Sequence, residues 1–153
     1  MLKKVKRNSI RAREAGFAIV ASQYNERYVD AMLNAAMAEL RRAGAKTVQI
    51  IRVPGAYEIP VVAARLAREG SVSAIICLGV ILRGETTHAQ HIGEAVSQAL
   101  MQIQITHGVP VIHEVLLLEN KQQAEARCLN PKHNRGVEAA QTAMEMARVM
   151  AQI

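Results

Sequence analysis

Four apolar, strand-like segments alternate with amphipathic segments along this chain, and that alternation constrains its fold more than any other feature. Residues 74–82 are all uncharged, which is typical of a strand buried on both faces. Such strands, alternating with helices, predict a parallel sheet covered by helices on both sides. We predict strands at residues 17–21, 48–53, 74–82 and 111–118, and helices at residues 26–43, 58–69, 88–106, 121–128 and 137–151.

The composition fits one domain with an aliphatic core. The chain has 153 residues, half of them hydrophobic, but only 3% are aromatic and none is Trp, so Ala, Val, Ile, Leu and Met must fill the core. No apolar run approaches the roughly 20 residues that span a bilayer. The basic beginning is not followed by the apolar stretch of a secretory signal, and two cysteines do not make a disulfide framework. We therefore expect a soluble, cytoplasmic protein.

Most of the net charge of +6 lies before Gly16, where six Lys and Arg side chains accompany one Glu. We expect residues 1–15 to form a flexible basic tail and residues 16–153 to form a single, nearly neutral domain. No aromatic-rich stacking surface accompanies the charges, so nucleic-acid binding is not expected as the main function. An assembly protein whose tail captures nucleic acid or anionic cargo is the alternative.

The loop after the third predicted strand, residues 83–88 (Arg-Gly-Glu-Thr-Thr-His), carries the strongest signal for a functional site. Such a loop offers free backbone N–H groups and the positive end of the next helix to an anion. His88, in the first helical turn, can gain or lose a proton near neutral pH. We hypothesise a phosphate cradle beside a proton-transfer group. An ordinary strand-to-helix turn is the alternative, because neither a Walker A loop nor a dinucleotide fingerprint is present.

Ligands of parallel sheets bind beyond the carboxyl ends of the strands, so residues 22–25 and 55–58 should lie at the same edge as that loop. Tyr24 could stack on a flat heterocycle, or only pack its ring beside Asn25 as a helix N-cap. Glu58 could accept hydrogen bonds from polyol hydroxyls, or only favour the dipole of its helix. These segments predict a small-molecule site without identifying the ligand.

Other histidines and arginines also allow two interpretations each. His91, one turn after His88, is a partner for it or a surface residue, and His113 within the fourth strand could be a satisfied core histidine. Arg127, at a helix end, and Arg135, in the following polar loop, could bind phosphate or only serve as ordinary basic residues. No spacing of Cys, His, Asp and Glu indicates a metal site.

Taken together, these segments resemble the 6,7-dimethyl-8-ribityllumazine synthase family over nearly the whole domain. The motifs that carry the resemblance are Tyr24-Asn25 and residues 16–20, 53–60, 79–88, 108–111, 125–127, 134–136 and 138–140. The resemblance implies a three-layer α/β/α sandwich around a mainly parallel, four-stranded, flavodoxin-like sheet. It also implies a transferase that condenses 5-amino-6-(ribitylamino)pyrimidine-2,4-dione with 3,4-dihydroxy-2-butanone 4-phosphate, releasing phosphate and water, without a metal or organic cofactor.

The resemblance further implies roles for single residues, with His88 as the catalytic proton-transfer group. Pyrimidine and ribityl binding is implied for Tyr24, Asn25, Ala56, Tyr57, Glu58, Val80, Ile81, Leu82, His113 and Arg135, and phosphate binding for Gly84, Glu85, Thr86 and Arg127. In the family, the groups at positions 113, 127 and 135 come from the neighbouring subunit. The expected partners are therefore two small-molecule substrates and further copies of the chain in a pentamer. Paired pentamers and icosahedral shells, both known in the family, stay open.

Several positions depart from the family pattern. His113 replaces the usual Phe, Glu114 the usual Gly and Arg135 the usual Lys, while residues 89–91 replace an aromatic-acidic-aromatic stretch. None of these changes removes His88. An imidazole at position 113 can still stack, but less strongly and with a possible charge.

Two non-catalytic functions would use the same fold. A flavin or lumazine carrier needs only the ring and ribityl contacts, so the retained proton-transfer and phosphate residues argue against it. A regulatory domain of flavodoxin-like type that binds phosphate or a nucleotide would need a lone acidic pocket or a Gly-rich phosphate loop, and the sequence has neither.

Overall fold

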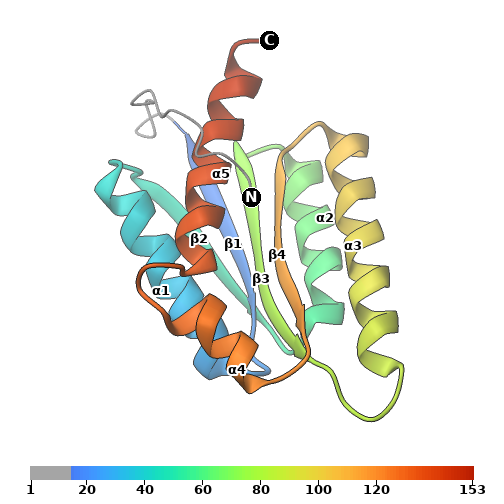
Figure 1. Ribbon diagram of the computed structural model, residues 1–153. Coiled ribbons are helices and arrows are strands. Elements are labelled where there is room, and N and C mark those ends of the chain that lie inside the picture. Colours follow the sequence, from blue (N-terminus) through green and yellow to red (C-terminus); the bar gives the residue numbers. More distant parts are fainter. Residues whose placement is uncertain (1–14) are drawn as a thin grey trace.

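The computed structural model describes residues 15–153 and confirms the predicted α/β class (Figure 1). The strands are β1 (Gly16–Ser22), β2 (Thr47–Val53), β3 (Ala74–Leu82) and β4 (Val111–Leu118). The helices are α1 (Glu26–Arg42), η1 (Ala56–Glu58, a 3₁₀ helix), α2 (Ile59–Glu69), α3 (His88–His107), α4 (Lys121–Ala124), η2 (Glu125–Leu129, a π-helix) and α5 (Arg135–Ala151). The expected basic tail lies outside the described residues, apart from Ala15.

The sheet is parallel throughout and has the strand order β2-β1-β3-β4. The helices α1 and α5 cover one face, and α2 and α3 cover the other, which confirms the three-layer sandwich (Figure 1). The chain runs from β1 outward to β2 and then returns to β3 on the other side of β1. The strand order therefore reverses between β1 and β3, where open α/β sheets place their ligand sites.

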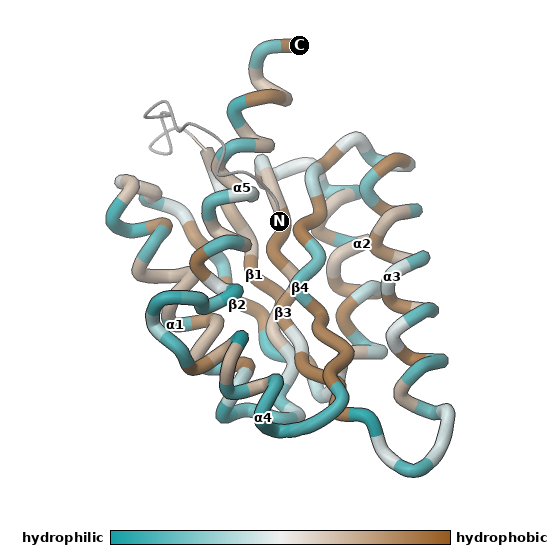
Figure 2. Tube along the Cα trace, viewed as in Figure 1, coloured by the Kyte–Doolittle hydropathy of each residue, from teal (hydrophilic) through white to brown (hydrophobic). Residues whose placement is uncertain are grey.

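Alternation along the strands builds a separate core on each face of the sheet. In β1, Phe17, Ile19 and Ala21 pack toward α1 and α5, whereas Ala18 and Val20 pack toward α2 and α3. All five are fully buried. Figure 2 shows the resulting apolar centre, with hydrophilic residues on the outer sides of the helices. Burial on both faces explains why the strands read as apolar runs rather than as alternating patterns.

The start of α5 differs from the prediction. The helix begins at Arg135, two residues earlier than expected, because Asn134 caps it: Asn134 Oδ1 accepts a hydrogen bond from the Gly136 N–H at 2.7 Å. Asn134 Nδ2 also donates to the Cys128 carbonyl at 2.7 Å. Gly136 lies so close to α1 that a Cβ there would be 2.0 Å from the Met32 carbonyl oxygen. Two independent constraints therefore fix the first turn of α5.

The predicted helix at residues 121–128 is also only partly correct. It consists of the single α-helical turn of α4 followed by the wider π-helical turn of η2, which ends at Leu129. Asn120 caps its beginning, since Asn120 Oδ1 accepts from the Gln123 N–H at 2.9 Å. The π-helical turn carries Arg127, so the backbone that presents this side chain is not a regular α-helix.

The strand β4 forms one of the two outer edges of the sheet. Two of its backbone N–H groups donate to side chains of the same chain. The Val111 N–H donates to Gln104 Oε1 at 2.9 Å, and the Val115 N–H donates to His113 Nδ1 at 3.1 Å. These two N–H groups of the edge strand are therefore already satisfied.

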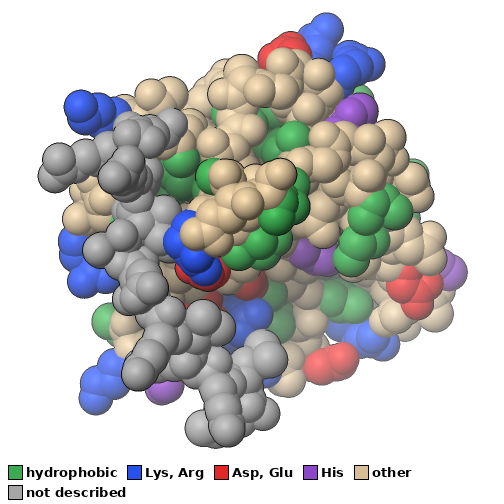
Figure 3. Space-filling view, turned by 90° about the horizontal axis from the view of Figure 1, so that it is seen from above, with side chains coloured by type: hydrophobic (Ala, Val, Ile, Leu, Met, Phe, Trp, Pro, Cys, Tyr) green, Lys and Arg blue, Asp and Glu red, His purple; other side chains and the backbone are tan. Residues whose placement is uncertain are grey.

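The face at the amino ends of the strands carries charged side chains of both signs (Figure 3). Figure 3 looks onto the amino ends of the strands, where Lys and Arg side chains are dispersed around the rim and acidic side chains lie among them. Within residues 15–153, no helix has both the length and the apolar character needed to cross a membrane.

Candidate active site

A pocket of about 710 Å³ opens at the carboxyl ends of β1 and β3, on the side of the sheet covered by α2 and α3. Volumes of about 300–1,000 Å³ are usual for small-molecule sites. The pocket lies where the strand order reverses, as the parallel topology predicts. Its lining residues are Tyr24, Asn25, Gly55, Ala56, Tyr57, Glu58, Val80, Ile81, Leu82, His88, His91, Ile92 and Ala95.

Asn25 joins the first two walls of this pocket. Its backbone is left-handed (φ 57°), which Asn tolerates better than most residues, and its carbonyl accepts the first hydrogen bonds of α1. The side chain does not cap α1, contrary to the simpler of the two predictions. Instead Asn25 Nδ2 donates to the Val80 carbonyl at 2.7 Å, which connects the loop after β1 to the end of β3.

Tyr24 and Glu58 meet at Gly55, the turn after β2. The Tyr24 N–H donates to the Pro54 carbonyl at 3.0 Å, and Glu58 Oε2 accepts from the Gly55 N–H at 3.0 Å. A Cβ on Gly55 would lie 2.9 Å from Tyr24 Cδ2 and 3.0 Å from Glu58 Oε2. Only glycine therefore lets the ring and the carboxylate approach this closely. The Tyr24 side chain is 70% exposed, so its ring is available to a ligand.

Val80, Ile81 and Leu82 form an apolar wall at the end of β3. The lining of the pocket thus combines two chemistries: an exposed aromatic ring and an apolar wall suit a flat heterocycle, whereas the Glu58 carboxylate suits hydroxyl groups. Neither feature involves a metal. Among the residues that the structure describes, no three His, Cys, Asp or Glu side chains are grouped so as to hold an ion.

Two histidines line the pocket from the first turn of α3. His88 is the predicted one, and Thr86 Oγ1 accepts a hydrogen bond from the His88 backbone N–H at 3.3 Å. His91, for which the sequence left two interpretations, also lines the pocket, and its Nε2 lies 3.3 Å from Thr87 Oγ1. A spacing of three residues on one helix face was the signal that could have placed both histidines in the site.

Gly84, Glu85 and Thr86 form the exposed loop between β3 and α3, next to the pocket but not among its lining residues. Arg83 anchors the beginning of this loop, because its Nε lies 3.1 Å from Glu119 Oε1 and its Nη2 donates to Gln90 Oε1 at 2.7 Å. The loop directly precedes a 20-residue helix, so it lies at the positive, amino-terminal end of that helix dipole.

His113 and Arg127 are not among the residues that line the pocket of their own chain. His113 is exposed on β4 rather than in the core, so the prediction of a core histidine is wrong. It is nevertheless satisfied: Nδ1 accepts from the Val115 N–H, and Nε2 lies 2.8 Å from Ser97 Oγ. Desolvation lowers the pKa of His113, in agreement with the acceptor role of its Nδ1. Arg127 is exposed, and within residues 15–153 it makes only a long contact to the Gln123 carbonyl, at 3.4 Å.

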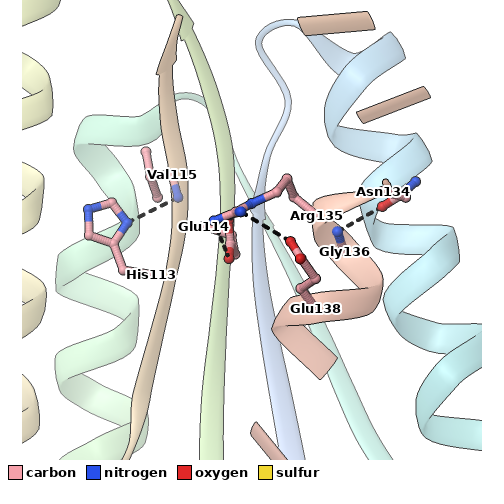
Figure 4. A network of polar contacts seen from close by, with 7 residues as sticks. All are labelled: His113, Glu114, Val115, Asn134, Arg135, Gly136 and Glu138. Atoms are coloured by element: carbon pink, nitrogen blue, oxygen red, sulfur yellow. Dashed lines mark hydrogen bonds and ion pairs between the residues drawn. The ribbon is translucent and has the colours of Figure 1, made fainter. Parts of the chain in front are cut away.

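Arg135 lies in the first turn of α5, not in the loop where the sequence placed it, and it too is outside the pocket lining. Figure 4 shows its guanidinium between two carboxylates. Nε and Nη2 lie 3.2 and 3.3 Å from the two oxygens of Glu114, and Nη1 lies 3.1 Å from Glu138 Oε2. Burial is the largest influence on Glu114 and raises the pKa of its carboxyl, while Arg135 lowers it by a smaller amount. Sequence reasoning did not foresee this ion pair.

The fold and the pocket define a parallel α/β protein with an open small-molecule site at its topological switch point. Comparison with known proteins gives the family: residues 14–151 match the family model for 6,7-dimethyl-8-ribityllumazine synthase, and the chain belongs to that family. Proteins with this name from Xanthomonas oryzae pv. oryzae (strain PXO99A) and Stenotrophomonas maltophilia (strain R551-3) are 41% and 40% identical to the chain. The alignments cover 92% and 91% of this chain, and 93% and 91% of those relatives.

Proposed function

We propose that this chain condenses 5-amino-6-(ribitylamino)pyrimidine-2,4-dione with 3,4-dihydroxy-2-butanone 4-phosphate to 6,7-dimethyl-8-ribityllumazine, with release of phosphate and water. Family membership over residues 14–151 supports the reaction. The observation that carries it is the pocket that brings together Tyr24, Glu58 and His88, which follow β1, β2 and β3 in the chain. The reaction is a step of riboflavin biosynthesis, and the cytoplasm is its proposed location.

Each wall of the pocket has a task in this reaction. The Tyr24 ring and the wall of Val80, Ile81 and Leu82 hold the pyrimidine, with Asn25 beside it, and Ala56, Tyr57 and Glu58 hold the ribityl chain. Alignment of two reactive substrates supplies most of the acceleration, since proximity replaces a bimolecular encounter. His88 transfers protons during imine formation and phosphate elimination. The loop of Gly84, Glu85 and Thr86 receives the phosphate at the amino end of α3.

The remaining site residues come from a second copy of the chain in a pentamer. His113, Arg127 and Arg135 bear ligand-binding chemistry but do not line the pocket of their own chain, which supports this arrangement. Arg127 binds the phosphate, His113 lies over the pyrimidine and Arg135 contacts the pyrimidine substrate. Arg127 is suited to an external anion because, among the residues that the structure describes, only one long contact engages it.

Lumazine absorbance, followed after mixing both substrates with the purified protein, tests the reaction. The expected result is product formation well above the uncatalysed background. Tight binding of the pyrimidinedione without acceleration would replace the proposed enzyme by a non-catalytic carrier.

Mixing two inactive variants tests the shared site. In a pentamer, His88→Ala and Arg127→Ala subunits complement each other wherever an intact His88 meets an intact Arg127 of the next subunit. Equal co-expression should therefore restore about one quarter of the sites, because each half-site is intact in one half of the subunits. Light scattering should give the mass of five chains or of a multiple of five. A monomer, or no recovery from correctly assembled mixtures, would contradict the shared site.

A further inference from the structure

Glu114 is a buried carboxylate that the proposed reaction does not use directly. It lies on β4, faces α5 and is only 7% exposed. Burial of a charge is costly unless a partner compensates it. Both Glu114 oxygens contact Arg135, at 3.2 and 3.3 Å, so a single guanidinium is held side-on by the whole carboxylate (Figure 4).

The contacts of Arg135 leave part of its guanidinium available. A guanidinium carries five N–H donors in a rigid plane. The contacts with Glu114 and Glu138 use one donor each on Nε, Nη1 and Nη2, so one donor remains on each terminal nitrogen. The Arg135 side chain is 42% exposed, which leaves these donors accessible from outside. The backbone beneath it is fixed on both sides, by the Asn134 cap and by the close approach of Gly136 to α1.

Glu114 is a poor candidate for a purely stabilising ion pair. Burial raises the pKa of its carboxyl even with Arg135 beside it, and the nearby Glu138 adds to the increase. The ionised carboxylate therefore costs the folded state free energy, although it orients a half-exposed arginine. A cost in stability together with a fixed, outward donor pair is the pattern of a group retained for binding.

We propose that Glu114 is a positioning residue: it holds the Arg135 guanidinium so that a remaining donor meets a carbonyl oxygen of the pyrimidinedione bound in the pocket of the neighbouring copy. This inference rests on the proposed function, since Arg135 does not line the pocket of its own chain. A guanidinium held in one orientation loses less conformational entropy on donating to a carbonyl oxygen of the dione than a freely rotating side chain does. Glu114 itself touches no substrate.

The test compares Glu114→Gln, Arg135→Gln and the double variant with the wild-type pentamer. The matched control is Glu145→Gln, which breaks the Glu145–Arg148 pair on the same helix α5. The first measurement is the rate at which phenylglyoxal modifies Arg135, read by peptide mass spectrometry with the exposed Arg68 of α2 as an internal reference. The second is the dissociation constant of the pyrimidinedione, measured by calorimetry without the second substrate. Neither measurement needs turnover.

If Glu114 positions Arg135, Glu114→Gln should expose Arg135 to faster modification and weaken pyrimidinedione binding about fivefold to twentyfold. The KM for the butanone phosphate and the response of Glu145→Gln should stay near wild type. Adding Glu114→Gln to Arg135→Gln should weaken binding no further, because the effect passes through Arg135. Should Glu114→Gln not assemble, Glu114→Asp, which keeps the charge but shortens the side chain, should give the same two changes at smaller size.

Unchanged pyrimidinedione binding in an assembled Glu114→Gln or Glu114→Asp pentamer would overturn the inference, and so would additive effects in the double variant. An unchanged modification rate would show that Glu114 does not hold Arg135. Wild-type protein that binds the pyrimidinedione but forms no lumazine would instead overturn the proposed function, and the binding comparison would still decide the role of Glu114.

Discussion

The Asn25 side chain donates to the Val80 carbonyl over 2.7 Å and so connects the loop after β1 to the end of β3, 55 residues further along the chain. This bond spans the switch point between β1 and β3, beyond whose carboxyl ends α/β sheets bind their ligands. Because Asn25 also has left-handed backbone, one residue shapes both the turn into α1 and the position of the β3 wall.

Replacement of Asn25 separates these two contributions. Asn25→Gly keeps the left-handed backbone but loses the hydrogen bond, so we expect a loss of about 1 kcal/mol of unfolding free energy. Asn25→Ala adds the left-handed strain of a Cβ residue, for a total of about 2–3 kcal/mol. Chemical denaturation at a fixed protein concentration measures both. Equal losses in the two variants would show that strain at this position is negligible.

His88→Ala should lower kcat about 10²-fold or more, because general acid–base catalysis typically contributes about 10²–10⁴-fold. The dissociation constant of the pyrimidinedione should change little, since the ring and ribityl contacts are retained. Steady-state kinetics and calorimetry separate the two effects. His107→Ala, at the far end of the same helix, is the control and should behave like wild type. An unchanged kcat would remove the proton-transfer role from His88.

Gly136→Ala should be strongly destabilising, by at least about 3 kcal/mol, since overpacking that forces the backbone to move is costly. The added Cβ would lie 2.0 Å from the Met32 carbonyl oxygen, which cannot rotate away. Gly93→Ala in α3 is the matched control: its Cβ would meet only the Leu117 side chain, at 3.4 Å from Cδ2 and 3.7 Å from Cβ. We expect this control to be neutral or more stable by up to about 1 kcal/mol, from helix propensity. Similar denaturation curves for both variants would contradict the close packing of α5 on α1.

Arg135→Gln should destabilise the protein more at pH 8 than at pH 5. The pKa of Glu114 is raised above its ordinary value of 4.5 by burial, and loss of Arg135 removes the main influence that opposes this rise. A raised carboxyl pKa means that the folded state keeps a proton that the unfolded state has released. Stability is therefore full below pH 4.5 and falls as the pH rises toward the folded pKa.

Removal of Arg135 leaves the buried Glu114 carboxylate without its partner, and we expect a cost of about 1–3 kcal/mol at pH 8, below that of a fully buried pair because Arg135 is 42% exposed. Unfolding free energies measured across the pH range check the prediction. The double variant Arg135→Gln with Glu114→Gln should lose the additional pH dependence. If the single variant is destabilised equally at both pH values, Glu114 is not the group that titrates.

Periodicity and apolar runs were sufficient to predict the sheet. The strand at residues 74–82 matches β3 at both ends, because burial on two faces leaves a continuous apolar signal. The parallel order then predicted one site edge, and Tyr24, Glu58 and His88 do share one pocket. The local sequence pattern and the topology rule together were therefore sufficient to predict that these three residues lie at one site.

Features that depend on tertiary contact were less accessible to sequence reasoning. Gly136 reads as a helix breaker, yet it lies inside α5 because α1 leaves no space for a side chain. The Asn134 cap was the signal that could have placed the helix start correctly. The Glu114–Arg135 pair joins residues 21 positions apart on a strand and a helix, and no local spacing predicts such a contact.

The satisfied donors on β4 also restrict how copies of this chain can meet. The Val111 and Val115 N–H groups are engaged by Gln104 and His113, so an incoming strand would find these positions of the edge occupied. An uncovered edge strand is a template for unlimited sheet growth. In the proposed pentamer, recognition between subunits passes to side chains. Their shape and charge can specify one rotation per step, and a fixed rotation allows a ring to close on itself rather than grow into a fibre.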